Sequence, residues 1–263
     1  MTTRRPLISV ICCAHNEAEY VDRCMPHLLN ALEGFFYEII FVADRCTDAT
    51  VEKARKYGVR IIEKNWKRWV NGYAESLQTG YLSSRGKYVG IVDVDIIVPT
   101  TFFKDLVPML KDRIVSVDAR VVTYPDTFWN RLIYAWEKTY DLAPLGRGHY
   151  GGARVVLKKA LDEIHGFRDV FTVDVDVDIR LAKRGYKSMS APTEKVYHLR
   201  HLSLKTMVRG QIRMGRGRYM VGYGFMKTVG HAIFRFRPFL LGGWFMEWVR
   251  RIRTRGYGET YEA

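Results

Sequence analysis

The sequence predicts an α/β fold, with a Rossmann-like, mostly parallel sheet flanked by helices and followed by a basic helical extension. Three observations lead to this prediction. Short apolar segments alternate with amphipathic segments along the first hundred residues, 48% of the 263 residues are hydrophobic, and positive charge is concentrated near the C-terminal end. Strands that alternate with helices at this spacing favour βαβ units, and the apolar content is sufficient for a large core.

The first strand is predicted at Leu7–Cys13, because a continuous apolar run suits a strand that is buried on both faces. The run breaks at Ala14–Glu17, where Asn16 is expected to cap a helix that extends to about Glu33. The alternation then continues with a strand at Tyr37–Val42, a helix at Asp48–Tyr57, a strand at Val59–Glu63 and a helix at Asn71–Ser84.

The fourth strand is predicted over Tyr88–Pro99 and carries two carboxylates, Asp93 and Asp95. Side chains at i and i+2 of an extended segment point the same way, so these two are expected to converge on one ligand. Neighbouring carboxylates repel each other unless a cation lies between them, and a hard divalent cation suits oxygen ligands. With the common strand order 3-2-1-4, the pair would lie beside Ala14–Glu17 at the binding crevice of the sheet.

The second half of the chain continues as α/β, with a run of carboxylates at Asp174, Asp176 and Asp178. We expect a helix to begin at Val173 or Asp174, where carboxylates interact favourably with the helix dipole. Other predicted elements are helices at 101–111, 127–140, 159–164 and 204–214, strands at 114–122, 153–157, 187–189 and 195–198, and a glycine-rich loop at 142–152 that resembles a flap.

The net charge of +14 lies mainly at the C-terminal end, since residues 200–263 contain 13 Lys or Arg and three Glu. We therefore divide the chain into a domain at 1–218 and a basic, aromatic extension at 219–263. Two interpretations of the extension remain open: a segment that lies on an anionic membrane surface, or a helix that packs on the domain or on a second copy.

Cysteine usage and the N-terminal sequence indicate the cellular setting. The four cysteines all fall in the first fifth of the chain and form no Cys-x-x-Cys pair, so neither a disulfide framework nor a zinc site is expected. No signal peptide is recognisable, and no apolar run approaches the ~20 residues that span a bilayer. We expect a cytoplasmic protein, with peripheral contact at the cytoplasmic membrane face.

Four motifs in order resemble those of a known family. They are Ile8–Glu17, which ends in Asn-Glu; Phe41–Thr50, with Asp44 and Asp48; the Asp-x-Asp of Ile91–Asp95; and Gly166–Lys187, followed by Val196–His198. This series resembles the family 2 glycosyltransferases, which are inverting nucleotide-sugar enzymes with the GT-A fold. The resemblance covers about residues 6–218.

The resemblance implies a donor site for a UDP- or GDP-sugar with Mn²⁺ or Mg²⁺. Asp95 and Asp93 would bind the metal together with His198, and an acceptor glycan or lipid carrier would supply the attacking hydroxyl. The cation would assist departure of the nucleoside diphosphate. The implied nucleotide-sugar contacts are Ala14, His15, Asn16, Glu17, Asp44, Arg68, Asp93 and Val94.

The resemblance also implies a carboxylate base that deprotonates the acceptor hydroxyl. Spacing from Arg180 and Gly185 favours Asp174, and Asp176 is a rival. The alternative from another class is a catalytically inactive, glycosyltransferase-like binding module that its basic tail recruits to a membrane or nucleic acid. Nucleic acid is not an expected partner of the enzyme. A dinucleotide-dependent oxidoreductase is disfavoured, because no Gly-x-Gly-x-x-Gly follows the first strand.

Overall fold

A computed structural model describes residues 5–138, 152–200 and 203–254. These residues form two compact units. The first contains the sheet and the helices that cover it, within residues 1–134, 148–169 and 173–200. The second comprises residues 135–147, 170–172 and 201–263, so the helix that begins at Leu204 groups with the extension that we expected to begin at residue 219.

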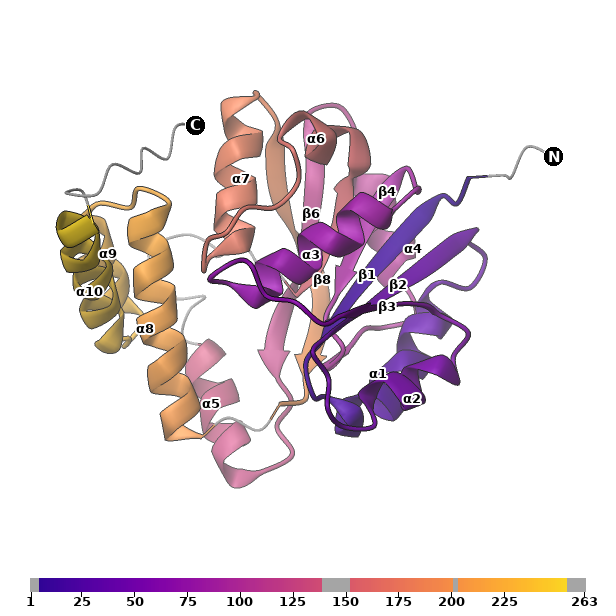
Figure 1. Cartoon of the computed structure of the whole chain (residues 1–263), viewed down its shortest axis with the longest axis horizontal. Helices are drawn as coiled ribbons and strands as arrows, with labels where there is room; N and C mark the ends of the chain where they lie inside the picture. The colour runs from indigo at the N-terminus through magenta and orange to yellow at the C-terminus, as the bar shows by residue number, and fades with distance from the viewer. Residues whose placement is uncertain (1–4, 139–151, 201–202, 255–263) are drawn as a thin grey trace. The chain divides into compact units, whose positions relative to one another are not determined.

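An eight-stranded sheet lies at the centre of the first unit, with the strand order β3-β2-β1-β4-β7-β6-β8-β5. Figure 1 labels most of these strands, among them β1, β4 and β8. The parallel pairs are β1 with β2 and β4, β2 with β3, and β6 with β8; β7 runs antiparallel to β4 and β6, and β5 antiparallel to β8. The predicted order 3-2-1-4 is confirmed. The strands are β1 (Ile8–Ala14), β2 (Tyr37–Asp44), β3 (Arg60–Lys64), β4 (Tyr88–Val92), β5 (Ile96–Ile97), β6 (Ile114–Thr123), β7 (Ala153–Leu157) and β8 (Lys187–His198).

Helices connect these strands close to the predicted positions. The helix predicted at 101–111 is a short α-helix followed by a 3₁₀ turn, and residues 142–151 of the expected flap lie outside the described part of the chain. The helices are α1 (Ala18–Ala31), α2 (Thr50–Arg55), α3 (Gly72–Ser83), α4 (Phe102–Leu106), η1 (Val107–Met109), α5 (Phe128–Lys138), α6 (Lys158–Glu163), α7 (Val173–Lys183), α8 (Leu204–Met220), α9 (Phe225–Phe234) and α10 (Phe239–Thr254).

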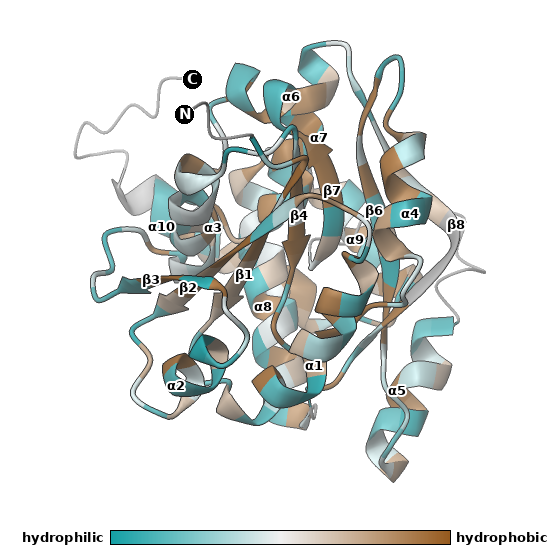
Figure 2. Cartoon of the chain, turned by 90° about the vertical axis from the view of Figure 1, so that its right-hand side faces the viewer, coloured by the Kyte–Doolittle hydropathy of each residue, from teal (hydrophilic) through white to brown (hydrophobic). Residues whose placement is uncertain are grey.

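The first strand is buried along its whole length, as its apolar sequence predicts. Ile8, Val10 and Cys12 belong to the hydrophobic cluster that includes residues of α1 and α4. On the other face, Ile11 meets α3 at Gly80, where a Cβ would lie 2.5 Å from Ile11 Cγ2. Figure 2 shows β1, β4 and β7 as apolar strands with more polar helices around them. Layers on both faces therefore fix the carboxyl ends of β1 and β4 in place.

Two sequence predictions need correction. The expected single strand over Tyr88–Pro99 ends at Val92, so Asp93 and Asp95 lie in a turn and do not project from one face of a strand. The turn forms because Ile96 leaves β4 to pair with His198 of β8, and the Ile96 N–H donates to Asp93 O at 3.1 Å. The two short strands expected near the end of the domain form one strand, β8, which follows β6 through two register shifts.

The second unit contains α8, α9 and α10, and glycines let two of these helices approach closely. A Cβ at Gly215 would lie 2.0 Å from Leu240 O, and one at Gly243 would lie 2.0 Å from Ile212 O. Glu247 is fully buried and accepts a hydrogen bond from Arg216 Nε at 2.9 Å. None of the described helices is both long enough and apolar enough to cross a membrane.

Candidate active site

The ends of three strands bring the predicted motifs to one edge of the sheet. β1 ends at Ala14, β4 ends at Val92 and β8 ends at His198. β1 and β4 are direct neighbours, and His198 pairs with Ile96 just after the two aspartates. The topology therefore places the loop after β1, the Asp93–Asp95 turn and His198 together.

Asp95 is the most buried carboxylate of this cluster, with only 2% of its surface exposed. Its Oδ2 lies 3.0 Å from His198 Nε2 and 2.9 Å from Arg200 Nη2. Burial alone would raise the pKa of Asp95, but contact with His198 and the charge of Arg200 bring that pKa below its ordinary value. Asp95 is therefore ionised at neutral pH.

Asp93 has different neighbours from Asp95. Its Oδ1 accepts a hydrogen bond from the Tyr73 hydroxyl at 2.8 Å, and its backbone N–H donates to Gly152 O at 3.0 Å. Burial and the nearby charge of Asp95 raise the pKa of Asp93. Between them, Val94 is 2% exposed and belongs to the hydrophobic core, so only its backbone can contact a ligand.

Arg200 joins the Asp95 turn to the loop after β1, and sequence reasoning missed it. Its Nη2 forms ion pairs with Glu17 Oε1 and with Asp95 Oδ2. Burial and the charge of Asp95 raise the pKa of Glu17 to about 7, although Arg200 opposes this shift. The position of Arg200, two residues after His198, was the signal in the sequence that could have identified it.

The loop after β1 is held by β2 and the loop that follows it. His15 Nδ1 lies 2.5 Å from Asp44 O, and Asn16 Oδ1 accepts a hydrogen bond from the Thr47 N–H at 2.7 Å. Asn16 adopts a φ of 55°, and Glu17 occupies the N-cap position before α1, which begins at Ala18. The prediction that Asn16 caps α1 is therefore wrong, because its side chain bonds to the neighbouring loop.

Asp44 sits in a buried network of charges. Its carboxylate is bound by Arg45 Nε at 2.8 Å and by the fully buried Lys64 Nζ at 2.8 Å. Lys64 also contacts Glu75 Oε2 at 3.1 Å, and Glu75 accepts the Arg68 N–H. Although burial raises the pKa of Asp44, hydrogen bonds from Arg45 and Lys64 lower it overall. The Arg68 residue itself is exposed.

The three carboxylates of α7 have three different environments. Asp176 is 1% exposed and pairs with Arg168 at 2.5 Å and with Arg180 at 2.7 Å. Asp178 accepts a hydrogen bond from the buried Arg154 Nη1 at 2.9 Å. No ion pair to Asp174 is found among the described residues.

Asp174 interacts electrostatically with Arg154 and with Tyr73. Its charge contributes to raising the pKa of Tyr73, whose hydroxyl donates to Asp93. Burial raises the pKa of Asp174 itself, although the charge of Arg154 opposes the shift. Asp176 and Asp178 are thus fixed in arginine ion pairs, whereas Asp174 forms none with a described residue.

Asp95 and His198 fit a divalent cation that takes its other ligands from a bound molecule. Among the described residues, no group of three or more His, Cys, Asp or Glu side chains can hold a metal on its own. Asp95 Oδ2 is buried and, although His198 and Arg200 lie close to it, has no partner with hydrogen-bond geometry. Carboxylate oxygen and imidazole nitrogen are both ligands for Mn²⁺, and diphosphate oxygens complete such sites. Asp93 Oδ1 already accepts a hydrogen bond from the Tyr73 hydroxyl. The geometry therefore favours Asp95 and His198 as the protein ligands.

The chain matches a protein-family model and curated glycosyltransferase sequences. A model of the family described as Glycosyl transferase family 2 matches residues 9–168. A dolichol-phosphate mannosyltransferase from Pyrococcus furiosus is 29% identical over 109 residues, which cover 40% of this chain and 30% of that protein. Glycosyltransferase EpsJ from Bacillus subtilis, described as uncharacterized, is 28% identical over 148 residues, which cover 52% of this chain and 43% of that protein. The chain thus spans less than half the length of these relatives.

Solved structures share the fold. Mannosyltransferase PcManGT from Pyrobaculum calidifontis, in complex with GDP-Man and Mn²⁺, aligns with a TM-score of 0.64 at 19% identity and covers 98% of this chain and 77% of that one. Glucosyl-3-phosphoglycerate synthase from Mycobacterium tuberculosis, in complex with Mn²⁺, UDP and phosphoglyceric acid, aligns with a TM-score of 0.60 at 19% identity and covers 83% and 80%. The predicted GT-A-type fold is confirmed.

Proposed function

The chain belongs to glycosyl transferase family 2, and from this premise we propose that it transfers a sugar from a nucleotide-diphosphate donor to an acceptor hydroxyl, with inversion at the anomeric carbon. One observation carries the proposal: the buried contact between Asp95 and His198 at the carboxyl ends of the strands. An ionised carboxylate beside an imidazole suits a metal-bound diphosphate, and a second carboxylate of raised pKa suits proton transfer.

We propose that the loop at Ala14–Glu17 and Asp44 bind the nucleoside, with Arg68 as a further contact at the rim. Asp44 is ionised and fixed by Arg45 and Lys64, so it can accept a hydrogen bond from a base without moving. GDP- and UDP-sugars are the first candidates, because the similar structures hold GDP-Man and UDP together with Mn²⁺.

Asp95 and His198 would hold the divalent cation, with Asp93 close by, on the Tyr73 side of the turn. When bound, the cation neutralises charge on the departing diphosphate, which is Lewis-acid assistance. Arg200 supplies a fixed positive charge beside Asp95 and Glu17. Arg200 and the bound cation would therefore place positive charge beside the departing diphosphate.

Asp174 is our choice for the base that accepts the proton of the acceptor hydroxyl. Its pKa is raised by burial, which strengthens a carboxylate as a base, and it forms no ion pair with a described residue. Asp176 is less suited to this role, because both of its oxygens are held by arginines. We propose that Asp176 positions α7, and through α7 orients Asp174.

We further propose that the acceptor is a lipid carrier or growing glycan at the membrane surface, and that the second unit contacts anionic lipid. Exposed apolar side chains of this unit support the proposal, because they alternate with arginines. They include Phe225, Met226, Ile233, Phe234, Phe236, Phe245 and Met246. Flotation with vesicles of phosphatidylcholine and phosphatidylglycerol tests this, and undiminished flotation after Phe234→Ser and Phe236→Ser would argue against it.

Nucleoside diphosphate release from a panel of UDP- and GDP-sugars, with Mn²⁺ and candidate acceptors, tests the transferase proposal. The wild-type chain should turn over one donor, and Asp95→Asn should lose most of that turnover. Asp112→Asn is a matched control, because Asp112 is exposed in the turn before β6, away from the strand ends that carry the site. Nucleotide binding without turnover of any donor would instead favour the inactive binding module.

A further inference from the structure

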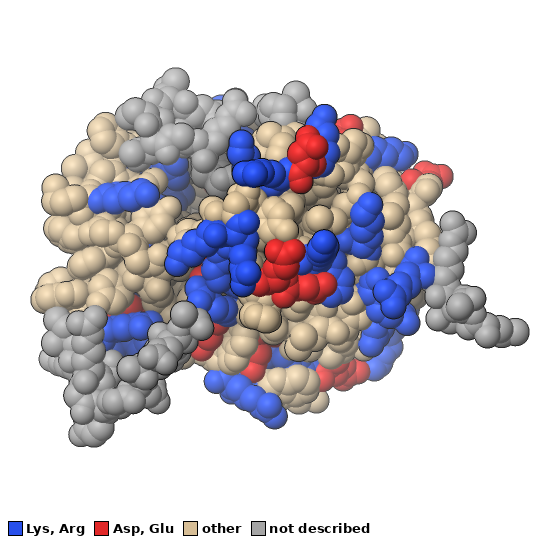
Figure 3. Space-filling view, turned by 90° about the horizontal axis from the view of Figure 1, so that it is seen from above, with Lys and Arg blue, Asp and Glu red and all other residues tan. Residues whose placement is uncertain are grey.

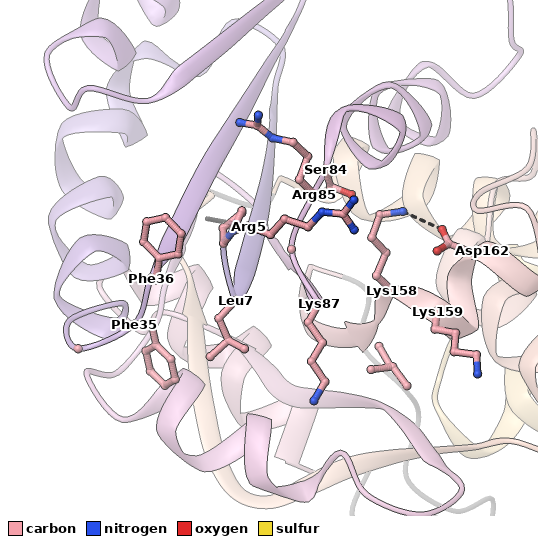
Figure 4. Close-up of a pocket in the computed structure, with 14 residues that line it drawn as sticks. Arg5, Leu7, Phe35, Phe36, Ser84, Arg85, Lys87, Lys158, Lys159 and Asp162 are labelled. Carbon is pink, nitrogen blue, oxygen red and sulfur yellow. Dashed lines mark hydrogen bonds and ion pairs between the residues drawn. The ribbon is translucent and has the colours of Figure 1, made fainter. Parts of the chain in front are cut away.

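A pocket opens at the end of the sheet opposite the proposed donor site. It has a volume of about 1140 Å³ and lies where β1 and β4 begin, whereas the donor site lies where these strands end (Figure 4). Four short segments of the first unit line it, together with Asp162: Arg5–Leu7, Gly34–Phe36, Ser84–Lys87 and Leu157–Lys159. A seven-residue strand separates the two sites by ~20 Å.

The lining of this pocket is strongly basic. Five cationic side chains and a single carboxylate face it, an excess of four formal positive charges. The carboxylate already has a partner, since Asp162 Oδ1 lies 2.7 Å from Lys158 Nζ. Figure 4 shows this ion pair, and Figure 3 shows Lys and Arg side chains interspersed with fewer Asp and Glu on the face that is viewed from above. The cationic residues are Arg5, Arg85, Lys87, Lys158 and Lys159.

Three of these cations have no acidic partner in the described part of the chain. Arg85 pairs with Glu38 at 3.3 Å, whereas Arg5, Lys87 and Lys159 form no ion pair with a described residue. Like charges that line one hollow repel each other, and this repulsion is relieved when an anion binds between them. The pocket therefore has the electrostatics of a binding site.

Apolar side chains also line the pocket, beside cations most of which are exposed to solvent. Leu7, Phe35, Phe36 and Leu157 line it beside the cations. Nearby apolar surface lowers the local dielectric, which strengthens attraction between an anion and the fixed cations. The volume of about 1140 Å³ is slightly above the usual upper range of about 1,000 Å³ for small-molecule sites.

We propose that this pocket binds a ligand that carries two or more phosphate groups, either a free small molecule or the head group of a phospholipid. Cations from separate segments can contact several phosphates of one ligand, whereas a ligand with a single carboxylate would leave most of the cations unpaired. Lysine is a common phosphate ligand that acts as a point charge. The proposal is independent of the transferase reaction, because it uses none of the donor-site residues.

Calorimetric titration of the full chain with sodium tripolyphosphate, in EDTA, tests the pocket without the divalent cation that the donor site would require. Wild-type protein should bind one equivalent, and the K87Q/K159Q double variant should bind about tenfold more weakly. The control is K104Q/K183Q, which removes two exposed lysines of α4 and α7 and the same net charge. Its affinity should match the wild type, and all three proteins should unfold at the same urea concentration.

Vesicles distinguish the two sources of phosphate. Flotation with phosphatidylcholine vesicles that contain phosphatidic acid should weaken in K87Q/K159Q, relative to K104Q/K183Q, if a lipid head group is the ligand. Tripolyphosphate binding that is lost in the double variant, with flotation unchanged, supports a free ligand. The proposal is overturned if wild-type protein binds neither probe, or if the double variant and the control bind both probes equally.

Discussion

Asp174 and Asp176 stand two residues apart on α7, yet their replacement by Asn should have opposite effects. Asp176→Asn removes the carboxylate that neutralises Arg180, whose side chain is 11% exposed and otherwise bonds to the Ile164 and Gly166 carbonyls. Breaking a buried ion pair costs about 3–5 kcal/mol. Arg168 is half exposed and adds little, so we expect a loss of about 3 kcal/mol.

Asp174→Asn should leave the fold almost as stable as the wild type. Arg154, the cation that acts on Asp174, keeps its ion pairs with Asp118 and Asp178. Turnover, however, should fall by about 10²–10⁴-fold if Asp174 is the base, because general-base catalysis contributes that much. Donor KM should stay within a few-fold, since the base acts on the acceptor.

Two measurements separate these effects. Urea unfolding followed by circular dichroism should show a midpoint lower by about 1 M for Asp176→Asn and little change for Asp174→Asn. Initial rates of donor turnover, measured with folded protein well below either midpoint, should be lost in Asp174→Asn. The assignment is refuted if Asp174→Asn keeps wild-type kcat, or if Asp176→Asn is as stable as wild type but inactive.

Two further predictions concern stability. Gly80→Ala should lower the free energy of unfolding by about 1–2 kcal/mol, because the new Cβ meets Ile11 at 2.5 Å; Gly230→Ala, in an open position of α9, should not destabilise, and equal effects of the two would contradict the packing argument. Burial and nearby arginines lower the pKa of His231 to about 4. The unfolded chain binds this proton near pH 6.5, so stability should fall as pH drops from 6.5 to 4, by up to about 3 kcal/mol. His231→Gln should flatten that part of the urea-unfolding profile, and an unchanged slope would show that His231 is not responsible.

The sequence was sufficient for the fold because each signal was local or topological. Continuous apolar runs identified β1 and β4 as buried strands, and alternation with helices predicted their adjacency. The pairing of Ile96 with His198 was different, since the contact spans about a hundred residues. Without it, Asp93 and Asp95 looked like parts of one strand, and the turn that separates their environments could not be foreseen.

Site residues that belong to a sequence motif could be predicted. Residues whose role depends on tertiary contacts could not. Arg200 bridges Glu17 and Asp95 only because the pairing of Ile96 with His198 brings the end of β8 to the Asp93–Asp95 turn. The choice between Asp174 and Asp176 depends on Arg168 and Arg180, whose side chains converge on one carboxylate in the folded chain. Spacing along α7 cannot show which carboxylate is already paired.

The most direct test of the account is metal-dependent nucleotide binding by Asp95. Calorimetry with GDP and with UDP, each with Mn²⁺ and with EDTA, should be run on wild type, Asp95→Asn and the exposed control Asp112→Asn. The account predicts that one nucleotide binds wild type and the control tightly only with Mn²⁺, and that Asp95→Asn loses most of this gain. Equal Mn²⁺-dependent binding by Asp95→Asn and wild type would contradict it.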